Sequence, residues 1–354
     1  MGEWKLISIK GEEYFKDFYL GYGFEFFPDG KVMIKKGYNK IAQKNDDRLI
    51  IYLGSVTQFK IEDDSLRIFD LKDSIWESYK IIRMTNDTLL LSNSVNNIEL
   101  FRKMKYNSDN VPSFDKIILS SSGCYGICPM MNIMIDSSGY VELLTERHNP
   151  RNGHFKSLIS AAKFKELRDN FRKINYLKLK DRYSSSFTDG EYISVTFLQN
   201  NKIVKSIYDY GYDSPAELQW AYVPIRFLNQ ELKLDTVPQT IVPYFNLEFV
   251  TFKDKTKQLR LTKSEAFLLW KYLQHGKKVD LSEHLSYELL LVENYIEEDI
   301  EKDCFGHLYF LEKIETDGRY FKIYLKNSRP YVIDIGFNFI ERNFSEPDFK
   351  TNEL

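Results

Sequence analysis

The chain has 354 residues, of which 43% are hydrophobic and 28% charged, and its formal net charge is −2 at pH 7. This length predicts two or three domains, and the composition is that of a globular protein that buries apolar cores. The balanced charge provides no basic surface for nucleic acid, so we expect no nucleic-acid partner. An aromatic share of 15% favours β structure.

The first residues of the chain, Met1 to Ser8, lack a charged segment followed by a long apolar one. They therefore predict no signal peptide. No apolar run approaches the length of a membrane span, so we expect no membrane partner. The small number of cysteines, 3 in all, fits a reducing compartment and predicts a cytoplasmic location.

Residues 1 to about 105 are expected to form short strands separated by turns. Pro28-Asp29-Gly30 stands between two apolar runs, where proline presets φ and glycine accepts a positive φ. Hairpins at roughly ten-residue spacing predict a meander that closes into a barrel. We expect strands over residues 4–9, 21–27, 31–35, 49–53, 58–61, 66–69, 79–84, 89–92 and 98–102.

This segment resembles the bacterial lipocalin-like domains in its Trp4-x-Leu6 start, its Phe-Pro-Asp-Gly turn and its repeated Tyr-x-Ile…Asp-x-Leu hairpins. The resemblance implies a small antiparallel barrel that could hold a small apolar ligand. A barrel filled by its own side chains would count against such a ligand. The residues expected to line the interior are Trp4, Phe24, Phe26, Ile61 and Ile81.

Residues 106–112 are polar, end in proline and are expected to link the barrel to a second region at 113–235. Ser160 is a plausible N-cap for a helix whose apolar positions Phe164, Leu167 and Phe171 share one face. A second helix is expected after Pro215, and Pro224 should kink or split it. We expect strands over residues 117–120, 131–135, 140–144, 192–197 and 203–208.

Two cysteines, Cys124 and Cys128, enclose Tyr125-Gly126-Ile127 and are followed by Pro129. Three interpretations stay open: a structural pair of thiols or a disulfide, a redox pair, and a metal site. The spacing is one residue longer than the thioredoxin Cys-x-x-Cys, and no basic residue within the loop would lower a thiol pKa. Zinc needs further ligands, and His148 and His154 are expected at the surface, so we predict neither metal nor cofactor.

This region resembles a bacterial domain of unknown function with a Cys-x-Gly-x-Cys-Pro signature. It departs from that pattern at Met130-Met131, where a hydroxyl residue and an aromatic residue would be expected. The resemblance implies no established activity. The positions that carry it are Cys124, Gly126, Cys128, Pro129, Asp136-x-x-Gly139, Gly153, Tyr183, Thr188-Asp189, Asp209-Tyr210 and Pro215.

The third region, residues 240–345, is expected to be a small α+β domain. Thr262-Lys-Ser-Glu265 has the form of a capping box and predicts a helix that ends at His275-Gly276. Residues 281–303 are acidic and ambiguous, and Cys304 is expected to be buried or inert. Strands are expected over residues 247–252, 259–261, 308–314, 320–325 and 331–335.

The sequence therefore predicts a β-rich α+β protein with three domains: a lipocalin-like barrel at 1–105, a cysteine-containing α+β domain at 113–235 and an α+β domain at 240–345. No phosphate-binding loop, dinucleotide fingerprint or hydrolase nucleophile motif is present, so we expect no enzyme. The favoured function is binding of a small apolar ligand or of a protein partner. The alternatives are a thiol-dependent redox or stress-response protein that uses Cys124 and Cys128, and a scaffold protein without a ligand.

Overall fold

The structure is a computed structural model. It describes residues 1–10, 21–44, 47–107, 110–238, 242–281, 285–291 and 311–352. The chain divides into two compact units. The first comprises 1–112, 165–179 and 212–232, and the second comprises 113–164, 180–211 and 233–354. The expected boundaries near 105, 113, 235 and 240 stay predictions.

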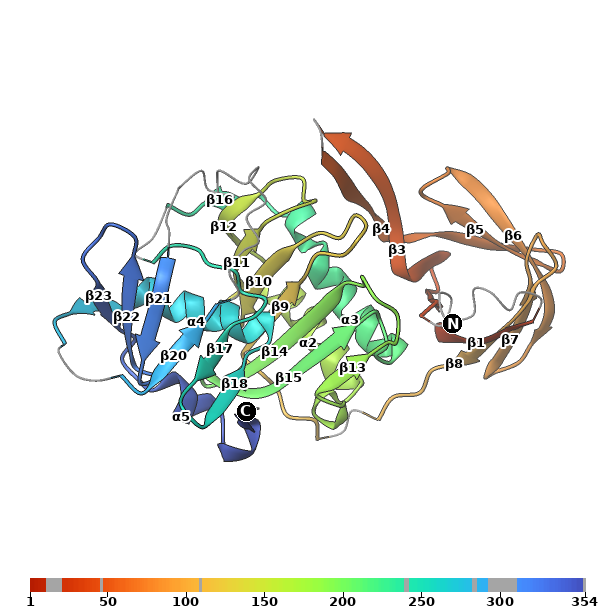
Figure 1. Ribbon diagram of the computed structural model, residues 1–354. Coiled ribbons are helices and arrows are strands. Elements are labelled where there is room, and N and C mark those ends of the chain that lie inside the picture. Colours follow the sequence, from red (N-terminus) through yellow and green to blue (C-terminus); the bar gives the residue numbers. More distant parts are fainter. Residues whose placement is uncertain are drawn as a thin grey trace. The chain divides into compact units, whose positions relative to one another are not determined.

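The first unit contains a closed antiparallel barrel of eight strands, in which each strand pairs with the next and β1 pairs with β8 (Figure 1). The barrel predicted from the sequence is confirmed. Its strands are β1 (Gly2–Lys10), β2 (Gly23–Phe26), β3 (Lys31–Lys44), β4 (Asp47–Glu62), β5 (Ser65–Asp70), β6 (Ile75–Met84), β7 (Thr88–Ser92) and β8 (Ile98–Lys103).

Three strands of the barrel are longer than predicted. β3 continues to Lys44, β6 begins at Ile75, and β4 joins the two strands predicted at 49–53 and 58–61. The sequence Gly54-Ser55 between them has the character of a turn. In the structure Gly54 has φ +106, and the β3–β4 register shifts beside it, between Met33 and Tyr38 and again between Tyr38 and Asn39. Glycine here allows an irregular pairing rather than a chain reversal, so the strand continues.

Helix α2 (Ala161–Lys173) forms where the sequence predicts it. The Oγ atom of Ser160 accepts a hydrogen bond of 3.1 Å from the backbone N–H of Lys163, which satisfies a group that the first turn leaves unpaired. Phe164, Leu167 and Phe171 are all buried, so the predicted apolar face is confirmed. A 3-10 turn, η1 (Tyr176–Lys178), follows.

Helix α3 (Ala216–Arg226) belongs to the first unit and has Pro215 as its N-cap. The expected split at Pro224 does not occur, since the helix continues to Arg226 before the 3-10 turn η2 (Leu228–Gln230). Pro224 cannot donate to the carbonyl four residues earlier, but helical hydrogen bonding continues past it, since the N–H of Phe227 donates to the carbonyl of Val223 at 3.3 Å. The Nε1 atom of Trp220 donates to the carbonyl of Gly21 at 2.8 Å, which ties the helix to the barrel segment.

The second unit contains two eight-stranded sheets (Figure 1). The first has the order β13-β15-β14-β9-β10-β11-β12-β16. Only the β13–β15 pair is parallel; the other neighbours are antiparallel. Its strands are β9 (Lys116–Ser121), β10 (Met131–Asp136), β11 (Tyr140–Thr145), β12 (Gly153–Leu158), β13 (Arg182–Ser184), β14 (Tyr192–Gln199), β15 (Lys202–Tyr210) and β16 (Asp235–Thr236).

The second sheet of this unit has the order β19-β23-β22-β21-β20-β17-β18-β24. The strand predicted at 247–252 is shorter, because only Thr251 to Lys253 pair. The first residues of the strand predicted at 308–314, and Cys304, lie outside the described residues. The strands are β17 (Thr251–Lys253), β18 (Lys257–Arg260), β19 (Lys277–Val279), β20 (Tyr287–Leu290), β21 (Leu311–Thr316), β22 (Tyr320–Leu325), β23 (Tyr331–Asp334) and β24 (Lys350–Thr351).

Helix α4 (Lys263–His275) connects the two sheets of the second unit through a common core. Thr262 and Glu265 form the predicted capping box, and Gly276 follows the last residue. Phe267 and Trp270 are buried in a cluster that also holds Ile118 of β9 and Phe321 of β22. Two short helices, α5 (Phe339–Asn343) and the 3-10 turn η3 (Glu346–Asp348), complete this unit.

Candidate functional site

The barrel interior was the first candidate site. Trp4, Phe24 and Phe26 lie there, with exposed fractions of 5%, 0% and 8%. The ring of Phe24 is 5.0 Å from that of Phe101, and the ring of Phe26 is 4.9 Å from that of Phe59. These aromatic rings pack against one another, so the side chains themselves occupy this part of the interior.

The two isoleucines predicted to line the barrel have different surroundings. Ile81 is partly buried against the core of the barrel. The prediction that Ile61 is an interior residue is wrong, because its side chain is 51% exposed. It pairs with buried Leu66, but it stands one residue before the end of β4. Strand alternation assigns a face, whereas burial also depends on the position along the strand.

The barrel interior also contains two carboxylates, on Glu77 and Glu99. Glu77 pairs directly with buried Ile68, and Glu99 pairs directly with buried Leu91, so both side chains share the inner face. Glu77 accepts a hydrogen bond of 2.8 Å from the hydroxyl of Tyr79. Burial and then the charge of Glu77 raise the pKa of Glu99. Among the described residues, no lysine or arginine forms an ion pair with either carboxylate.

The second candidate site is the disulfide loop, which we define as Gly123 to Pro129. Cys124 and Cys128 are joined by a disulfide, and their Cα atoms lie 5.7 Å apart. The loop follows β9 and precedes β10, two neighbouring strands of the sheet. Tyr125 stands between the cysteines with 93% of its surface exposed. The disulfide therefore braces a short loop that holds a tyrosine in solvent.

A second loop accompanies the disulfide loop. The backbone N–H of Tyr125 donates to the carbonyl of Asp189 at 3.1 Å. Phe187, in the same segment as Asp189, is 54% exposed, and its ring is 6.1 Å from that of Tyr210. The hydroxyl of Tyr210 accepts a hydrogen bond of 3.0 Å from the N–H of Gly190. Two aromatic side chains are thus presented by neighbouring loops fixed through backbone hydrogen bonds.

A buried lysine lies at the base of the disulfide loop. Lys263 is the first residue of α4, and its side chain is 0% exposed. Its Nζ atom lies 2.9 Å from Glu146 and 3.5 Å from Glu248, and it donates to the carbonyl of Ser121 at 2.9 Å. Ser121 in turn donates to the carbonyl of Pro129, the last residue of the loop. The two carboxylates therefore compensate the charge of Lys263, and hydrogen bonds through Ser121 link the lysine to the disulfide loop.

A second buried network surrounds Glu142, which is 2% exposed. It interacts with His154 Nε2 at 2.7 Å, with Lys271 Nζ, and with the hydroxyl of Tyr140 at 3.0 Å. Burial opposes its ionisation, but the hydrogen bond from His154 and the charge of Lys271 lower the pKa of Glu142 to about 2. His154 was expected at the surface, and that prediction is wrong, because it is 5% exposed.

The disulfide loop and the strands on either side of it lie in a segment of the sequence that matches a known family. Residues 115–229 match the family described as a domain of unknown function, DUF6438. Residues 115–229 form a DUF6438 domain. The DUF6438 domain includes both cysteines, Tyr125 and Phe187, as well as Glu142 and His154. Lys263 lies outside it, although its ion pair with Glu146 reaches back into it. No curated protein matches the chain.

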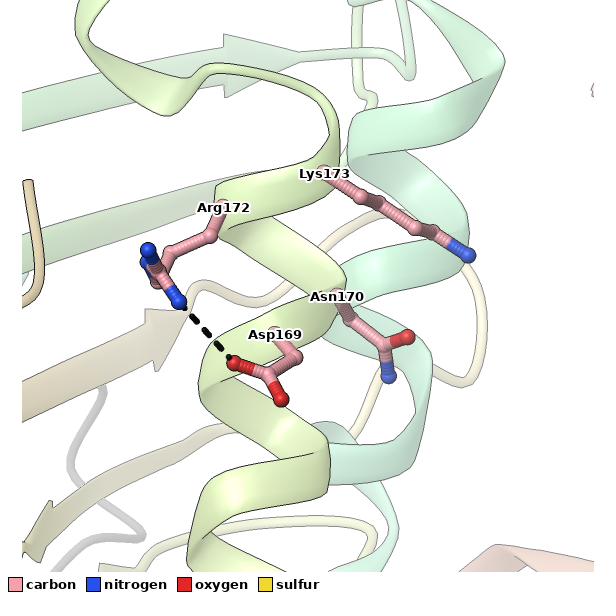
Figure 2. A pocket seen from close by; sticks show the side chains of 4 residues that line it. All are labelled: Asp169, Asn170, Arg172 and Lys173. Atoms are coloured by element: carbon pink, nitrogen blue, oxygen red, sulfur yellow. Dashed lines mark hydrogen bonds and ion pairs between the residues drawn. The ribbon is translucent and has the colours of Figure 1, made fainter. Parts of the chain in front are cut away.

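An open depression of about 340 Å³ on α2 is the third candidate. Figure 2 shows the four side chains that line it: Asp169, Asn170, Arg172 and Lys173. Asp169 pairs with Arg172 at 3.4 Å, and Arg172 also donates to the carbonyl of Val111 at 3.0 Å. Lys173 pairs with Glu3 at 2.9 Å. The charges of Asp169, Arg172 and Lys173 already have partners within the chain, so they do not indicate a bound ligand.

Sequence reasoning missed the residues that make the buried networks. Lys263 lies within the capping box, in a first helical turn where a lysine ordinarily reaches solvent. Glu142 is a charged residue of a kind that is rarely buried. Within the described ranges, no three His, Cys, Asp or Glu side chains are grouped so that they could hold a metal. In the same ranges, no helix has the length and apolar character needed to cross a membrane.

Proposed function

We propose that this protein is a non-enzymatic binding protein whose partner is another protein that contacts the disulfide loop. The carrying observation is Tyr125, 93% exposed at the tip of a loop closed by the Cys124–Cys128 disulfide. Tyrosine is enriched among the residues that dominate protein interfaces. A braced loop loses little conformational freedom when it binds, so more of the contact energy remains as affinity.

Phe187 enlarges this surface. It is 54% exposed, and its segment is held to the disulfide loop by the hydrogen bond between Tyr125 and Asp189. The two exposed aromatic side chains, on neighbouring loops held by hydrogen bonds, form an apolar surface surrounded by polar backbone groups. Such a surface suits a partner with a complementary apolar pocket.

The packing of the barrel interior favours the hypothesis of a protein partner over that of a small apolar ligand. Trp4, Phe24, Phe26 and Phe101 pack together in its interior. A small barrel filled by side chains is a packed core rather than a ligand cavity. We infer that the lipocalin-like barrel acts here as a structural module.

Photo-crosslinking tests the proposed interface. Replacing Tyr125 with p-benzoylphenylalanine in the full chain, expressed in its host, should give a discrete crosslinked protein after irradiation. The matched control carries the same photoreactive residue at Leu158, which is 72% exposed on β12. The purified partner should then bind the Tyr125→Ala and Phe187→Ala variants about tenfold more weakly each. Crosslinks that are absent from position 125, or equal at 158, would refute the proposal.

A thiol-dependent redox function is the second candidate, favoured by the disulfide itself. Both cysteines are only partly covered by other residues, so a dithiol reductant could reach the bond. Reduction would transfer two electrons and two protons to the pair and oxidise the reductant to its disulfide. Equilibration in glutathione or dithiothreitol buffers distinguishes the roles. A redox pair should titrate above about −300 mV, whereas a structural disulfide stays closed there.

Beside this function we propose a lipocalin-like relationship for the barrel and a bacterial origin. Division of residues 113–345 into two α+β domains is also a proposal. The eight-stranded closed barrel supports the first of these. The disulfide counts against the reducing cytoplasm, because such bonds persist mainly in oxidising compartments.

A further inference from the structure

Two arginines, one from each sheet of the second unit, lie against aromatic side chains. We call this group of residues the arginine–tyrosine face and define it as Arg182, Tyr192, Tyr208, Phe249 and Arg260. Arg182 lies on β13, the edge strand of its sheet in the part of the chain that is described. Its register partner across the parallel β13–β15 pair is Tyr208.

Aromatic contacts fix both guanidinium groups. That of Arg182 lies 4.1 Å from the ring centre of Tyr208, and that of Arg260 lies 5.1 Å from the ring centre of Phe249. Tyr208 also stacks on Tyr192 with ring centres 5.0 Å apart. Stacked guanidinium groups keep their outer N–H donors pointed at a ligand and lose little freedom when they bind.

Backbone contacts bring the segment of Arg260 towards Tyr208, the residue on which Arg182 stacks. The backbone N–H of Ser264, four residues after Arg260, donates to the Oγ atom of Ser194 at 3.0 Å, and Ser194 is the register partner of Tyr208. Burial raises the pKa of Tyr208, and the positive charges of Arg182 and Arg260 oppose that rise. Both arginine side chains are exposed. Neither forms an ion pair with a carboxylate among the described residues. The nearby acids are already engaged, since Asp181 pairs with Lys205 and Glu248 with Lys263.

We infer that the arginine–tyrosine face binds an acidic segment of the protein partner, with carboxylates on the two guanidinium groups and the segment laid along β13. The assignment rests on the protein-binding function proposed above and names the chemistry of the partner. Guanidinium matches carboxylate geometry through paired N–H donors, and an edge strand offers backbone groups to an extended chain. The overall charge of −2 favours a peptide over nucleic acid as the source of the anion.

Fluorescence anisotropy with the full chain tests this site. The probes are fluorescein-labelled ten-residue peptides of alternating Thr-Glu, Thr-Gln and Thr-Lys, and a labelled oligonucleotide of ten thymidines. The Thr-Glu peptide should bind at least tenfold more tightly than the other three in 50 mM salt, and should be released in 500 mM salt. Stronger binding of the oligonucleotide, or equal binding of the Thr-Gln peptide, would overturn the inference.

Substitutions locate the binding. Arg182→Gln and Arg260→Gln should each weaken binding of the Thr-Glu peptide about tenfold, and Arg182→Lys should recover only part of the loss. The control Arg329→Gln removes one exposed positive charge from the turn between β22 and β23 and should change binding less than twofold. Circular dichroism confirms that each variant is folded.

The outcomes separate the two proposals. A partner that crosslinks from Tyr125 but whose affinity is unaffected by Arg182→Gln and Arg260→Gln refutes the arginine–tyrosine face alone. Binding of the Thr-Glu peptide that depends on both arginines, without a crosslink from Tyr125, refutes the disulfide-loop interface alone. An equal loss in the Arg329→Gln control shows a general charge effect and also refutes the site.

Discussion

The Nζ atom of Lys263 lies 2.9 Å from the carboxylate of Glu146, although the lysine side chain is 0% exposed. A buried ammonium group needs compensation, and here Glu146, Glu248 and the carbonyl of Ser121 provide it. The arrangement connects the first turn of α4 to the strand that leads into the disulfide loop. Stability and presentation of the loop are therefore coupled.

Lys263→Met should lower the free energy of unfolding by about 3 kcal/mol, because it leaves two carboxylates without their cation. The effect stays near the lower end of the range for buried pairs, since Glu146 is 14% and Glu248 17% exposed. Urea denaturation followed by circular dichroism measures it. The control Lys313→Met breaks the exposed 2.8 Å pair with Glu315 and should cost under about 0.5 kcal/mol. Equal costs in the two variants would contradict the prediction.

Removing the disulfide should have a modest effect on stability. The cysteines are separated by 4 positions, so the bond closes a very short loop. The loop-entropy relation gives about 2 kcal/mol for such a closure. Unfolding of the native chain should become easier with dithiothreitol, while a Cys124→Ser, Cys128→Ser double variant should not respond to it. A reductant effect of the same size in the double variant would assign the change to another cause.

Acid unfolding should depend on Glu142. Its pKa of about 2 in the folded chain lies below the ordinary value of 4.5. The carboxylate therefore stabilises the fold above pH 4.5, and this contribution, on the order of 3 kcal/mol, is lost as the pH falls towards 2. Glu142→Gln should flatten the stability curve between pH 5 and 2, as measured by urea denaturation at a series of pH values. Glu312→Gln, at an exposed position, serves as the control and should leave the curve unchanged.

Glu99 should show the opposite sign. Burial and the charge of Glu77 raise its pKa in the folded chain. Its ionisation therefore destabilises the barrel, with full stability below the ordinary carboxyl pKa and a loss as the pH rises through the higher folded value. Glu99→Gln should raise the melting temperature at pH 8 by a few degrees and have little effect at pH 4. A lower melting temperature at pH 8 would show that the charged form is the stabilising one.

Local sequence signals predicted much of the fold. Pro28-Asp29-Gly30 turns as expected, with Gly30 at φ +80, and Thr262 caps α4 together with Glu265. These features depend on neighbours in the sequence, so they can be read without the tertiary structure. Gly54 shows the limit. The same residue type permits a turn or a bulge, and only the pairing of β3 with β4 decides between them.

The candidate site was less accessible to prediction. The cysteine pair was visible from its spacing, but its oxidation, and the 93% exposure of Tyr125, depend on the fold. Lys263 and Glu146 form an ion pair although more than a hundred residues separate them in the sequence, and no local pattern predicts such a pair. Arg182 and Arg260 lie on strands of two different sheets, and only the tertiary contact of Ser264 with Ser194 relates these segments.

The discontinuity of the first unit has a consequence for synthesis of the chain. The barrel strands end at Lys103, yet Lys5 pairs with Glu217 at 2.9 Å, and Gln230 donates to the carbonyl of Ile50 at 2.9 Å. A ribosome delivers these partners long after the barrel strands have emerged. During this interval the barrel strands lack the partners of Lys5 and Ile50. We therefore expect chaperones to bind the incomplete first unit until residues 212–232 have been synthesised.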